Sequence, residues 1–454
     1  MSWSGPTGVL VVEHLPHEGP YAIGTALAAA GLPVRVCRTW AGDPVPESPA
    51  GLAALVVLGG PMAAYDDSPA FATRAAELTL LRAALDSEVP VLGVCLGARL
   101  LAVAAGGTSG PGTARRIGWG EVRTAPVASA DPLFADVPER LRVLHGHGDT
   151  VDLPPGATLL ASCDRHRVQA FRIGGSAWGV RFHLEADKAA VDAFATAPPG
   201  EAATAPDLQD CAPAALTALA PHRDDVFERF AALAARRATA TTTRAFFTPR
   251  AAAWEERFAV DGPRYTAAVA RMRLRPGQRV LDVGCGSGRA LPALRAEVGA
   301  AGVVLGADLT PAMLTAAARE GRTGLLLADA CRLPLPAGSL DGIFSAGLVD
   351  HVPDPEAALR EWARVAAQGG VLLLFHPSGR AERAARHGRA PDPGDPLAEE
   401  NLRPALLSAQ ARYAAGTREI LESWLAGRPI REEYLIVDGG ALAGTGAHSY
   451  SVTG

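Results

Sequence analysis

The sequence predicts two α/β domains, each with three layers in which helices cover both faces of a mostly parallel sheet. Three observations support this prediction. The chain has 454 residues, more than one ordinary hydrophobic core accommodates. Short apolar runs alternate with longer helical stretches rich in Ala, Leu and Arg, as strand–helix units around a parallel sheet do. This alternation occurs twice, and a segment rich in Ala, Pro and Thr separates the two occurrences.

The apolar runs and the segment between them give the expected elements and boundaries. In the first half, strands are expected at 8–14, 32–38, 52–61 and 89–97, with helices near 20–30, 70–87 and 98–105. In the second half, strands are expected at 279–286, 302–309, 324–330, 340–347 and 370–377. We predict a first domain over 1–237 with a helical part at 190–237, a linker over 238–246, and a second domain over 247–454.

The composition favours a cytoplasmic globular protein that acts on small molecules. Hydrophobic residues make up 48% and charged residues 20% of the chain, and the N-terminus lacks the pattern of a signal peptide. No membrane association is expected, since no apolar run approaches the roughly 18 residues of a membrane span. The net charge of −5 gives no reason to expect nucleic-acid binding. The six cysteines include no CxxC pair, so neither a disulfide framework nor a metal site is predicted.

The run PVLGVCLGARLLA (90–102) is typical of a nucleophile elbow, a sharp turn between a buried strand and a helix. Its Gly-x-Cys-x-Gly core places Cys95 in the turn, where glycines relieve crowding. The N-terminus of the following helix would lower the pKa of the thiol and favour the thiolate. Cys95 is therefore a candidate nucleophile, although a cysteine considered alone is more often a core residue.

A base and an orienting carboxylate follow downstream in SAWGVRFHLEAD (176–187). His183 and Glu185 would share a face of an extended segment, so that Glu185 steadies His183 while His183 faces Cys95. Backbone N–H groups of Gly60 and Leu96 could form an oxyanion hole.

Four motifs in this order resemble class I glutamine amidotransferases of the GMP synthase-like type: GGPM (59–62), GVCLGARLL (93–101), LHGHGDTVDLP (144–154) and GVRFHLE (179–185). The resemblance implies a flavodoxin-like fold and hydrolysis of the glutamine side-chain amide through a γ-glutamyl thioester on Cys95, with release of ammonia. Two features depart from the family pattern. Arg99 replaces a Gln that helps to hold the substrate, and Arg181 and Leu184 replace Gln and Pro around the base. Either the substrate differs from glutamine or glutaminase activity is weak.

A glycine-rich turn in VLDVGCGSGRA (280–290) indicates a nucleotide site in the second half. An apolar strand precedes the turn, a helix follows it, and Asp308 ends the next strand, where its carboxylate could accept hydrogen bonds from ribose hydroxyls. From these residues alone, the ligand could be a dinucleotide or S-adenosylmethionine.

The motifs over about 245–390 resemble class I S-adenosylmethionine-dependent methyltransferases that act on small molecules, with a Rossmann-like fold. They are DVGCGSG (282–288), GADLTPAML (306–314), LLLADACRLPL (325–335), SLDGIFSAGLVDHVPDP (339–355) and ALREWARVAAQGGVLLLFHP (358–377). The resemblance implies that Asp282 contacts the methionine amine and that Asp329 and Ala330 contact the adenine edge. The other implied cofactor-binding residues are Gly284, Gly286, Gly288, Asp308, Leu309 and Gly347.

Recognition of the methyl acceptor is the part of the site that the sequence describes least. Asp350 or His351 could deprotonate an acceptor, although capping and solvation explain both residues equally well. An antiparallel hairpin of 432–438 and 448–454 is expected at one sheet edge.

The sequence therefore predicts a bifunctional enzyme that hydrolyses glutamine or a γ-glutamyl amide and methylates a small molecule with S-adenosylmethionine. No ATP-binding synthetase domain is recognisable, so either an ammonia-accepting enzyme is a separate partner protein or the hydrolase acts on a γ-glutamyl amide for its own sake. Two alternatives remain open. The first domain could be a catalytically silent scaffold beside an active methyltransferase, or both domains could sense ligands without turnover.

Overall fold

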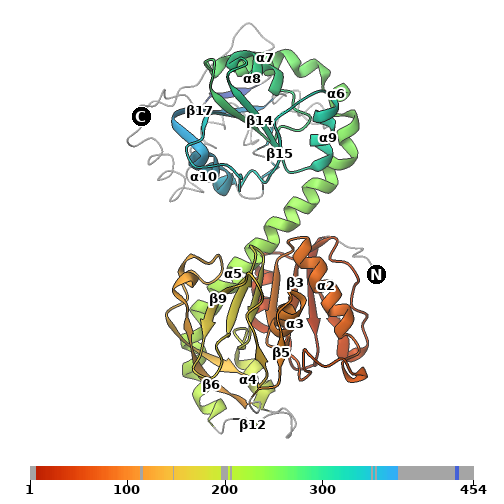
Figure 1. The fold of residues 1–454 in the computed structure, drawn as a ribbon, viewed down its shortest axis with the longest axis vertical. Helices are drawn as coiled ribbons and strands as arrows, with labels where there is room; N and C mark the ends of the chain where they lie inside the picture. Colours follow the sequence, from red (N-terminus) through yellow and green to blue (C-terminus); the bar gives the residue numbers. More distant parts are fainter. Residues whose placement is uncertain are drawn as a thin grey trace, which may run out of the picture. The chain divides into compact units, whose positions relative to one another are not determined.

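The structure, a computed structural model, divides the chain into two compact units, Met1–Thr241 and Thr242–Gly454 (Figure 1). It describes residues 7–112, 116–146, 148–195, 203–204, 207–348, 351–352, 355–376 and 435–438. Each unit contains a sheet with parallel strands and helices on its faces, which confirms the predicted α/β fold class.

The first unit is built on five parallel strands in the order β2-β1-β3-β4-β11, which is the flavodoxin-like order. The strands are β1 (Gly8–Glu13), β2 (Val34–Arg38), β3 (Leu52–Val57), β4 (Val91–Val94) and β11 (Ala177–Val180). Both faces of β1 are buried, which explains its continuous apolar run. Val9 and Val11 face one core cluster, and Leu10 and Val12 face the other.

Four helices complete the three layers of the first unit. One core cluster joins the sheet to buried residues of α1 (Tyr21–Ala29) and α5 (Leu208–Phe247). The cluster on the opposite face joins it to α2 (Arg74–Asp86) and α3 (Leu96–Ala104). This arrangement leaves the carboxyl ends of β3 and β4 next to the start of α3.

The sheet of the first unit continues beyond β11 through antiparallel pairs that the sequence analysis did not predict. The additional strands are β6 (Arg116–Thr124), β7 (Arg140–His145), β9 (Thr158–Ser162) and β10 (Ala170–Ile173), with the two-residue strand β12 (Ala203–Thr204) at the far edge. Two further short strands, β5 (Ser109–Gly110) and β8 (Thr150–Val151), pair with each other. Helix α4 (Lys188–Ala195) follows β11.

The segment 238–246, which we predicted to be a linker, is helical. It belongs to α5, which continues without interruption to Phe247. The Thr239 side chain donates a hydrogen bond to the Ala235 carbonyl, 3.1 Å away, so this hydroxyl is satisfied within the helix. The run of threonines therefore does not end the helix.

In the described ranges of the second unit, six strands form a sheet in the order β15-β14-β13-β16-β17-β18, and their pairs are parallel. The strands are β13 (Arg279–Val283), β14 (Val303–Asp308), β15 (Leu325–Leu327), β16 (Leu340–Ala346), β17 (Ala366–His376) and β18 (Leu435–Asp438). The first five follow the Rossmann-like order 3-2-1-4-5. Helices α7 (Gly262–Arg271) and α8 (Leu291–Val298) cover one face, and α10 (Pro355–Val365) covers the other. The described part of this unit also contains α6 (Trp254–Arg257) and α9 (Pro311–Arg319).

One strand of the expected antiparallel hairpin lies partly within the described residues. Residues 435–438 form β18, which extends the sheet by pairing with β17 in parallel. The second expected strand, 448–454, lies outside the described residues, so the hairpin stays a prediction.

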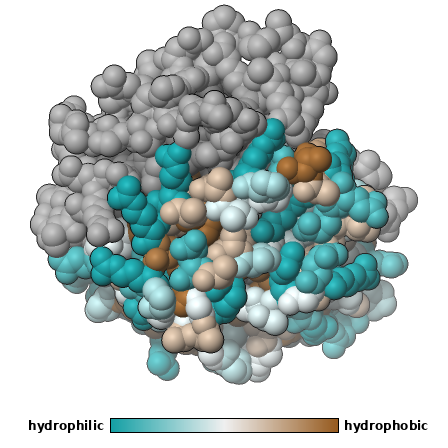
Figure 2. Space-filling view, turned by 90° about the horizontal axis from the view of Figure 1, so that it is seen from above, coloured by the Kyte–Doolittle hydropathy of each residue, from teal (hydrophilic) through white to brown (hydrophobic). Residues whose placement is uncertain are grey.

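The coloured part of the surface in Figure 2 mixes hydrophilic residues with small, separated hydrophobic areas. Within the described ranges, no helix has both the length and the apolar character that a membrane span requires.

Candidate functional site

Cys95 occupies the predicted elbow between β4 and α3. Its backbone has a φ of 52°, in the left-handed region that non-glycine residues rarely adopt. The flanking glycines are required by close backbone packing, because a Cβ at Gly93 would lie 2.5 Å from the Gly97 carbonyl oxygen and one at Gly97 would overlap the Val57 carbonyl. The elbow thus fixes the position of the thiol at the N-terminus of α3.

His183 and Glu185 are buried and joined by a 2.7 Å contact between Nδ1 and Oε1. They reach this geometry through a turn, not through the extended strand that we predicted. Strand β11 ends at Val180, the His183 amide donates to the Leu144 carbonyl at 2.8 Å, and the Ala186 amide donates back to the His183 carbonyl. The turn folds Glu185 back onto the imidazole.

The second nitrogen of the His183 ring, Nε2, is the atom available for proton transfer. Nε2 is buried and makes no hydrogen bond within the described part of the chain. A Cβ at Gly146 would lie 2.9 Å from this atom, so the glycine of the LHGHGDTVDLP motif keeps space beside it. Catalytic contacts of this kind often become well aligned when the substrate binds.

Cys95 and His183 stabilise each other as a thiolate and an imidazolium. Burial alone would raise the pKa of the Cys95 thiol, but the His183 cation, assisted by Arg99, lowers it below its ordinary value. Burial alone would lower the pKa of His183, but Glu185 and the Cys95 thiolate raise it well above its ordinary value. The site thus favours a charged nucleophile and a charged acid.

The two predicted oxyanion donors lie beside this pair. Leu96 is the first residue of α3, and first-turn amides have no acceptor within their helix. Gly60 lies beyond the end of β3, and a Cβ at Gly60 would lie 2.9 Å from Leu96 Cδ2 and from His14 Cβ. The elbow and the Gly59–Gly60 turn therefore meet at the same edge of the sheet.

The two arginines that depart from the family pattern converge on Asp149. Arg99 is buried and forms an ion pair with the Asp149 carboxylate. Arg181 is also buried and donates hydrogen bonds to the Asp149 carbonyl and, at 2.8 Å, to the Val168 carbonyl. Asp149 thus balances part of the charge of Arg99.

The sequence analysis missed the role of one further histidine in the structure. His14, which belongs to none of the motifs, is 2% exposed and contacts both Gly59 and Glu77. His145 is half-buried, and desolvation lowers its pKa to about 4. His147 lies outside the described residues.

The second unit contains a cavity of about 320 Å³ at the carboxyl ends of its parallel strands. Seven of the nine predicted cofactor residues line it: Gly284, Gly286, Asp308, Leu309, Asp329, Ala330 and Gly347. Gly288 does not line it, because this glycine serves packing: a Cβ there would lie 2.9 Å from Leu291. Asp282, the remaining residue, is buried outside the cavity lining.

Asp308 connects the glycine turn to the end of β14. Its carboxylate accepts hydrogen bonds from the Gly286 amide at 2.9 Å and the Thr310 amide at 2.7 Å. Gly284 and Gly286 have positive φ values of 73° and 54°, which glycine adopts without strain. Each carboxylate oxygen has a second lone pair, so Asp308 can still accept a ribose hydroxyl.

Asp282 is 2% exposed, and its Oδ1 has no hydrogen-bond partner in the described ranges. Burial, followed by repulsion from Asp308, raises the pKa of Asp282 to about 8. A buried carboxyl with an unsatisfied oxygen next to a glycine turn suits a cationic group of a ligand. This observation and the cavity fit the amine of S-adenosylmethionine.

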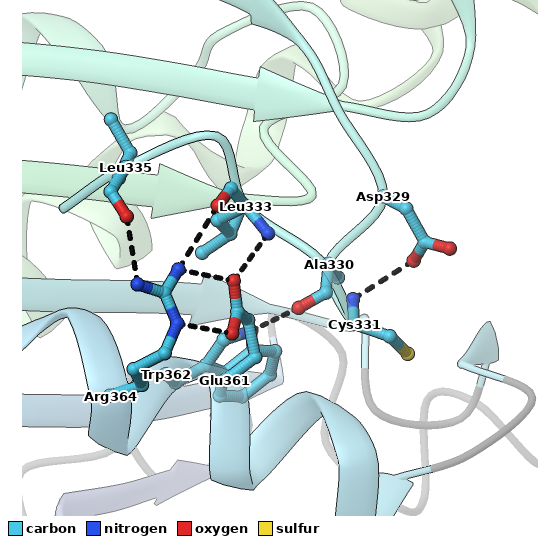
Figure 3. A network of polar contacts seen from close by, with 8 residues as sticks. All are labelled: Asp329, Ala330, Cys331, Leu333, Leu335, Glu361, Trp362 and Arg364. Carbon is cyan, nitrogen blue, oxygen red and sulfur yellow. Dashed lines mark hydrogen bonds and ion pairs between the residues drawn. The ribbon is translucent and has the colours of Figure 1, made fainter. Parts of the chain in front are cut away.

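Helix α10 anchors the loop that carries Asp329 and Ala330 (Figure 3). Trp362 Nε1 donates to the Ala330 carbonyl at 3.0 Å, and the Glu361 carboxylate accepts the Leu333 amide at 2.6 Å. Arg364 bonds to Glu361 at 2.7 Å and to the carbonyls of Leu333 and Leu335. No sequence pattern indicates this network, since helix α10 and the loop that it contacts are separated by about thirty residues.

One end of the cavity is aromatic. Phe247, Trp254 and Phe258 line it in successive edge or tilted contacts, with ring centroids 5.6 and 4.8 Å apart. His351, a predicted candidate base, also lines the cavity and stacks edge-on against Phe247 at 5.4 Å. Asp350, the other candidate base, lies outside the described residues.

Comparisons with known families agree with these two sites. Residues 20–194 match the family described as glutamine amidotransferase class-I, and residues 281–374 match the family described as methyltransferase domain. The chain therefore carries a class-I glutamine amidotransferase domain followed by a methyltransferase domain, and both predicted resemblances are confirmed.

Individual relatives cover parts of the chain. A glutamine-hydrolyzing GMP synthase of Xanthomonas axonopodis pv. citri (strain 306) is 35% identical over 158 residues, which are 33% of this chain and 28% of the synthase. A formate dehydrogenase of Pseudomonas sp. (strain 101) is 84% identical over 45 residues, 10% of this chain and 11% of the dehydrogenase. A solved glutamine amido transferase from Methylobacillus Flagellatus is 27% identical with a TM-score of 0.45, covering 50% of this chain and 96% of that one. The chain thus spans less than a third of the two curated relatives.

Proposed function

We propose that the amidotransferase domain hydrolyses glutamine or a related γ-glutamyl amide, and that the methyltransferase domain transfers a methyl group from S-adenosylmethionine to a small molecule. The observation that supports the first activity most strongly is the alignment of Cys95, His183 and Glu185 in one buried cluster. The support for the second is the cavity lined by the glycine turn and Asp308.

In the proposed hydrolysis, the Cys95 thiolate attacks the amide carbonyl carbon, and the electron pair of the carbonyl moves to its oxygen. The amides of Gly60 and Leu96 stabilise this oxyanion. His183 then donates its Nε2 proton to the leaving nitrogen, the C–N bond breaks, and ammonia and a thioester on Cys95 form.

The thioester is hydrolysed through the same groups in reverse roles. Neutral His183 accepts a proton from water, the resulting hydroxide attacks the thioester carbonyl, and the C–S bond breaks to restore the thiolate and the imidazolium. Glu185 holds the ring and stabilises its charge through the 2.7 Å contact in both halves of the reaction.

Arg99 favours a substrate that does not need the contact made by the family's substrate-binding Gln. It fills the position of the family's substrate-binding Gln, and its guanidinium is engaged by Asp149. We propose that this pair narrows the range of γ-glutamyl amides that the site accepts, so a panel of such amides belongs in the assay alongside glutamine.

In the methyltransferase domain, the bound cofactor would supply an electrophilic methyl group on a sulfonium. The chain itself contributes binding and desolvation: Asp308 holds the glycine turn, Asp282 offers its buried carboxyl to the cofactor amine, and the aromatic end of the cavity excludes water beside the acceptor.

Ammonia release by the full chain tests the hydrolase, with Cys95→Ala as the inactive variant and Cys163→Ala as the matched control. We expect release by the wild type and the control, and background release by Cys95→Ala. Equal background release by all three with every amide of the panel would support a silent scaffold. Calorimetry with S-adenosylhomocysteine tests the second site independently, with loss of binding expected in Asp308→Ala; equal affinity of variant and wild type would contradict the proposed site.

A further inference from the structure

His14 is a buried residue outside the predicted triad, and it contacts the turn that carries one oxyanion donor. We propose that His14 is a positioning residue that fixes the Gly59–Gly60 peptide so that the Gly60 N–H faces the reacting carbonyl above Cys95. The inference builds on the proposed amide hydrolysis and adds a group that holds the oxyanion hole in its active form.

The contacts of His14 tie three elements together at the end of β1. Nδ1 lies 2.9 Å from the Gly59 carbonyl oxygen, and Nε2 lies 2.9 Å from Glu77 Oε2. The other Glu77 oxygen accepts the Thr73 hydroxyl at 2.7 Å, at the start of α2. Since the side chains of His14 and Glu77 are 0% and 1% exposed, water does not compete for these bonds.

The contact with Gly59 requires a proton on Nδ1 of His14, and the contact with an ionised Glu77 requires a second proton on Nε2. A carbonyl oxygen can accept a hydrogen bond but cannot donate one, so Nδ1 must carry a proton. The carboxylate of Glu77 likewise accepts from Nε2. Although burial opposes protonation, the hydrogen bond that His14 donates to Glu77 and the negative charge of Glu77 raise the pKa of His14. Glu77 and Glu18 are the charged groups that act on the ring, and both favour the imidazolium.

The geometry of one peptide unit links His14 to the oxyanion hole. The Gly59 carbonyl and the Gly60 N–H belong to the same peptide, which is trans because the described chain contains no cis bond. In a trans peptide these two groups point in opposite directions. Holding the carbonyl toward His14 therefore directs the N–H away from His14, toward the substrate side of the elbow.

A pair of glycines makes such a hold necessary. Glycine lacks a Cβ and populates several backbone conformations, so the Gly59–Gly60 peptide can rotate more easily than others. Larger residues are excluded here, because a Cβ at Gly60 would lie 2.9 Å from His14 and from Leu96. A cation bonded to the carbonyl also polarises the peptide and strengthens its N–H as a donor.

The test compares His14→Leu, which removes the donor, with His14→Gln, which keeps an N–H that can reach Gly59. Thr73→Val is the matched control, since it removes the outer hydrogen bond and leaves His14 in place. For His14→Leu we expect kcat for amide hydrolysis to fall about 100-fold, the loss typical of one oxyanion donor, with KM changed less than about threefold. His14→Gln should recover about tenfold of that loss. Alkylation of Cys95 by iodoacetamide should stay within about twofold of wild type, because it uses the thiolate and no oxyanion.

Crystal structures of the wild type and His14→Leu test the inference without reference to turnover. We expect the Gly59–Gly60 peptide to rotate in the variant, with the Gly59 carbonyl turned away from position 14. An unrotated peptide, or a kcat within threefold of wild type, would overturn the inference. If His14→Leu does not fold, Glu77→Gln weakens the hold on the ring and is subject to the same criteria. Absence of ammonia release by the wild type would count against the proposed hydrolysis alone, and the two crystal structures would still decide the role of His14.

Discussion

Replacing Glu185 by Gln should destabilise the thiolate–imidazolium pair at the proposed hydrolase site. The contact between His183 and Glu185 is 2.7 Å long, and both side chains are buried. With charge centres about 4 Å apart and an effective dielectric constant of about 20, their attraction is about 4 kcal/mol. Loss of this attraction lowers the pKa of His183, since Glu185 is the largest of the contributions that raise it.

The sign of the effect on Cys95 follows from this loss. A less basic His183 stabilises the thiolate less, so the pKa of Cys95 rises toward its ordinary value. The midpoint of the pH profile for alkylation by iodoacetamide should therefore move to higher pH in Glu185→Gln. Ammonia release near neutral pH should fall by about three orders of magnitude, the equivalent of about 4 kcal/mol.

The assay measures both rates from pH 5 to 10 in the wild type, in Glu185→Gln and in Glu139→Gln, which removes an exposed carboxylate of the same domain as a control. An alkylation midpoint that is the same in Glu185→Gln and wild type would refute the reasoning, because the carboxylate would then have no influence on the pair. Thermal unfolding of each variant establishes that the comparison is made between folded proteins.

Three further predictions concern other groups. Arg99→Gln removes a cation that lowers the pKa of Cys95, so the midpoint of the alkylation pH profile should be higher. It also breaks a largely buried ion pair with Asp149, so the free energy of unfolding should be lower by about 2 kcal/mol. Equal alkylation midpoints in variant and wild type would contradict the role of Arg99. Trp362→Phe removes the hydrogen bond to the Ala330 carbonyl, so the affinity for S-adenosylhomocysteine measured by calorimetry should fall about fivefold, while an unchanged affinity would show that the α10 anchor does not shape the site. Because the pKa of Asp282 is raised to about 8, the folded state holds a proton that the unfolded state releases near pH 4. This group therefore makes the free energy of unfolding fall as pH rises from about 4 to 8, by at most about 1.4 kcal/mol per pH unit. Denaturant titrations of the wild type and Asp282→Asn should differ in this slope, and parallel curves would count against the raised pKa of Asp282.

The parallel cores of both units could be predicted because their strands carry continuous apolar runs. All six residues of β1 are buried, so sequence hydrophobicity and burial coincide there. Strand β7, in contrast, reads Arg-Leu-Arg-Val-Leu-His and exposes both arginines, so its pattern resembles that of a surface loop. Such half-exposed antiparallel strands are defined by their partners, which sequence periodicity does not identify.

The parts of the sites that could be predicted are those whose functional residues lie within short sequence motifs. The elbow around Cys95 and the turn from Gly284 to Gly286 each lie within a few residues of sequence. The contacts that support them are distant: His14 and Glu77 are separated by 63 positions, and Ala330 and Trp362 by 32. No local pattern indicates that such residues meet, so the sequence does not identify His14 as part of the site.

The left-handed backbone at position 95 has a practical consequence for engineering this domain. A non-glycine residue with a φ of 52° carries a conformational cost of order 1–3 kcal/mol, which glycine would relieve. Selection for thermostability alone would therefore favour glycine at position 95, which relieves the backbone strain but also removes the nucleophilic thiol. Libraries of variants of this domain need a screen for catalytic activity beside the screen for thermal stability, because otherwise the most stable variants will be inactive.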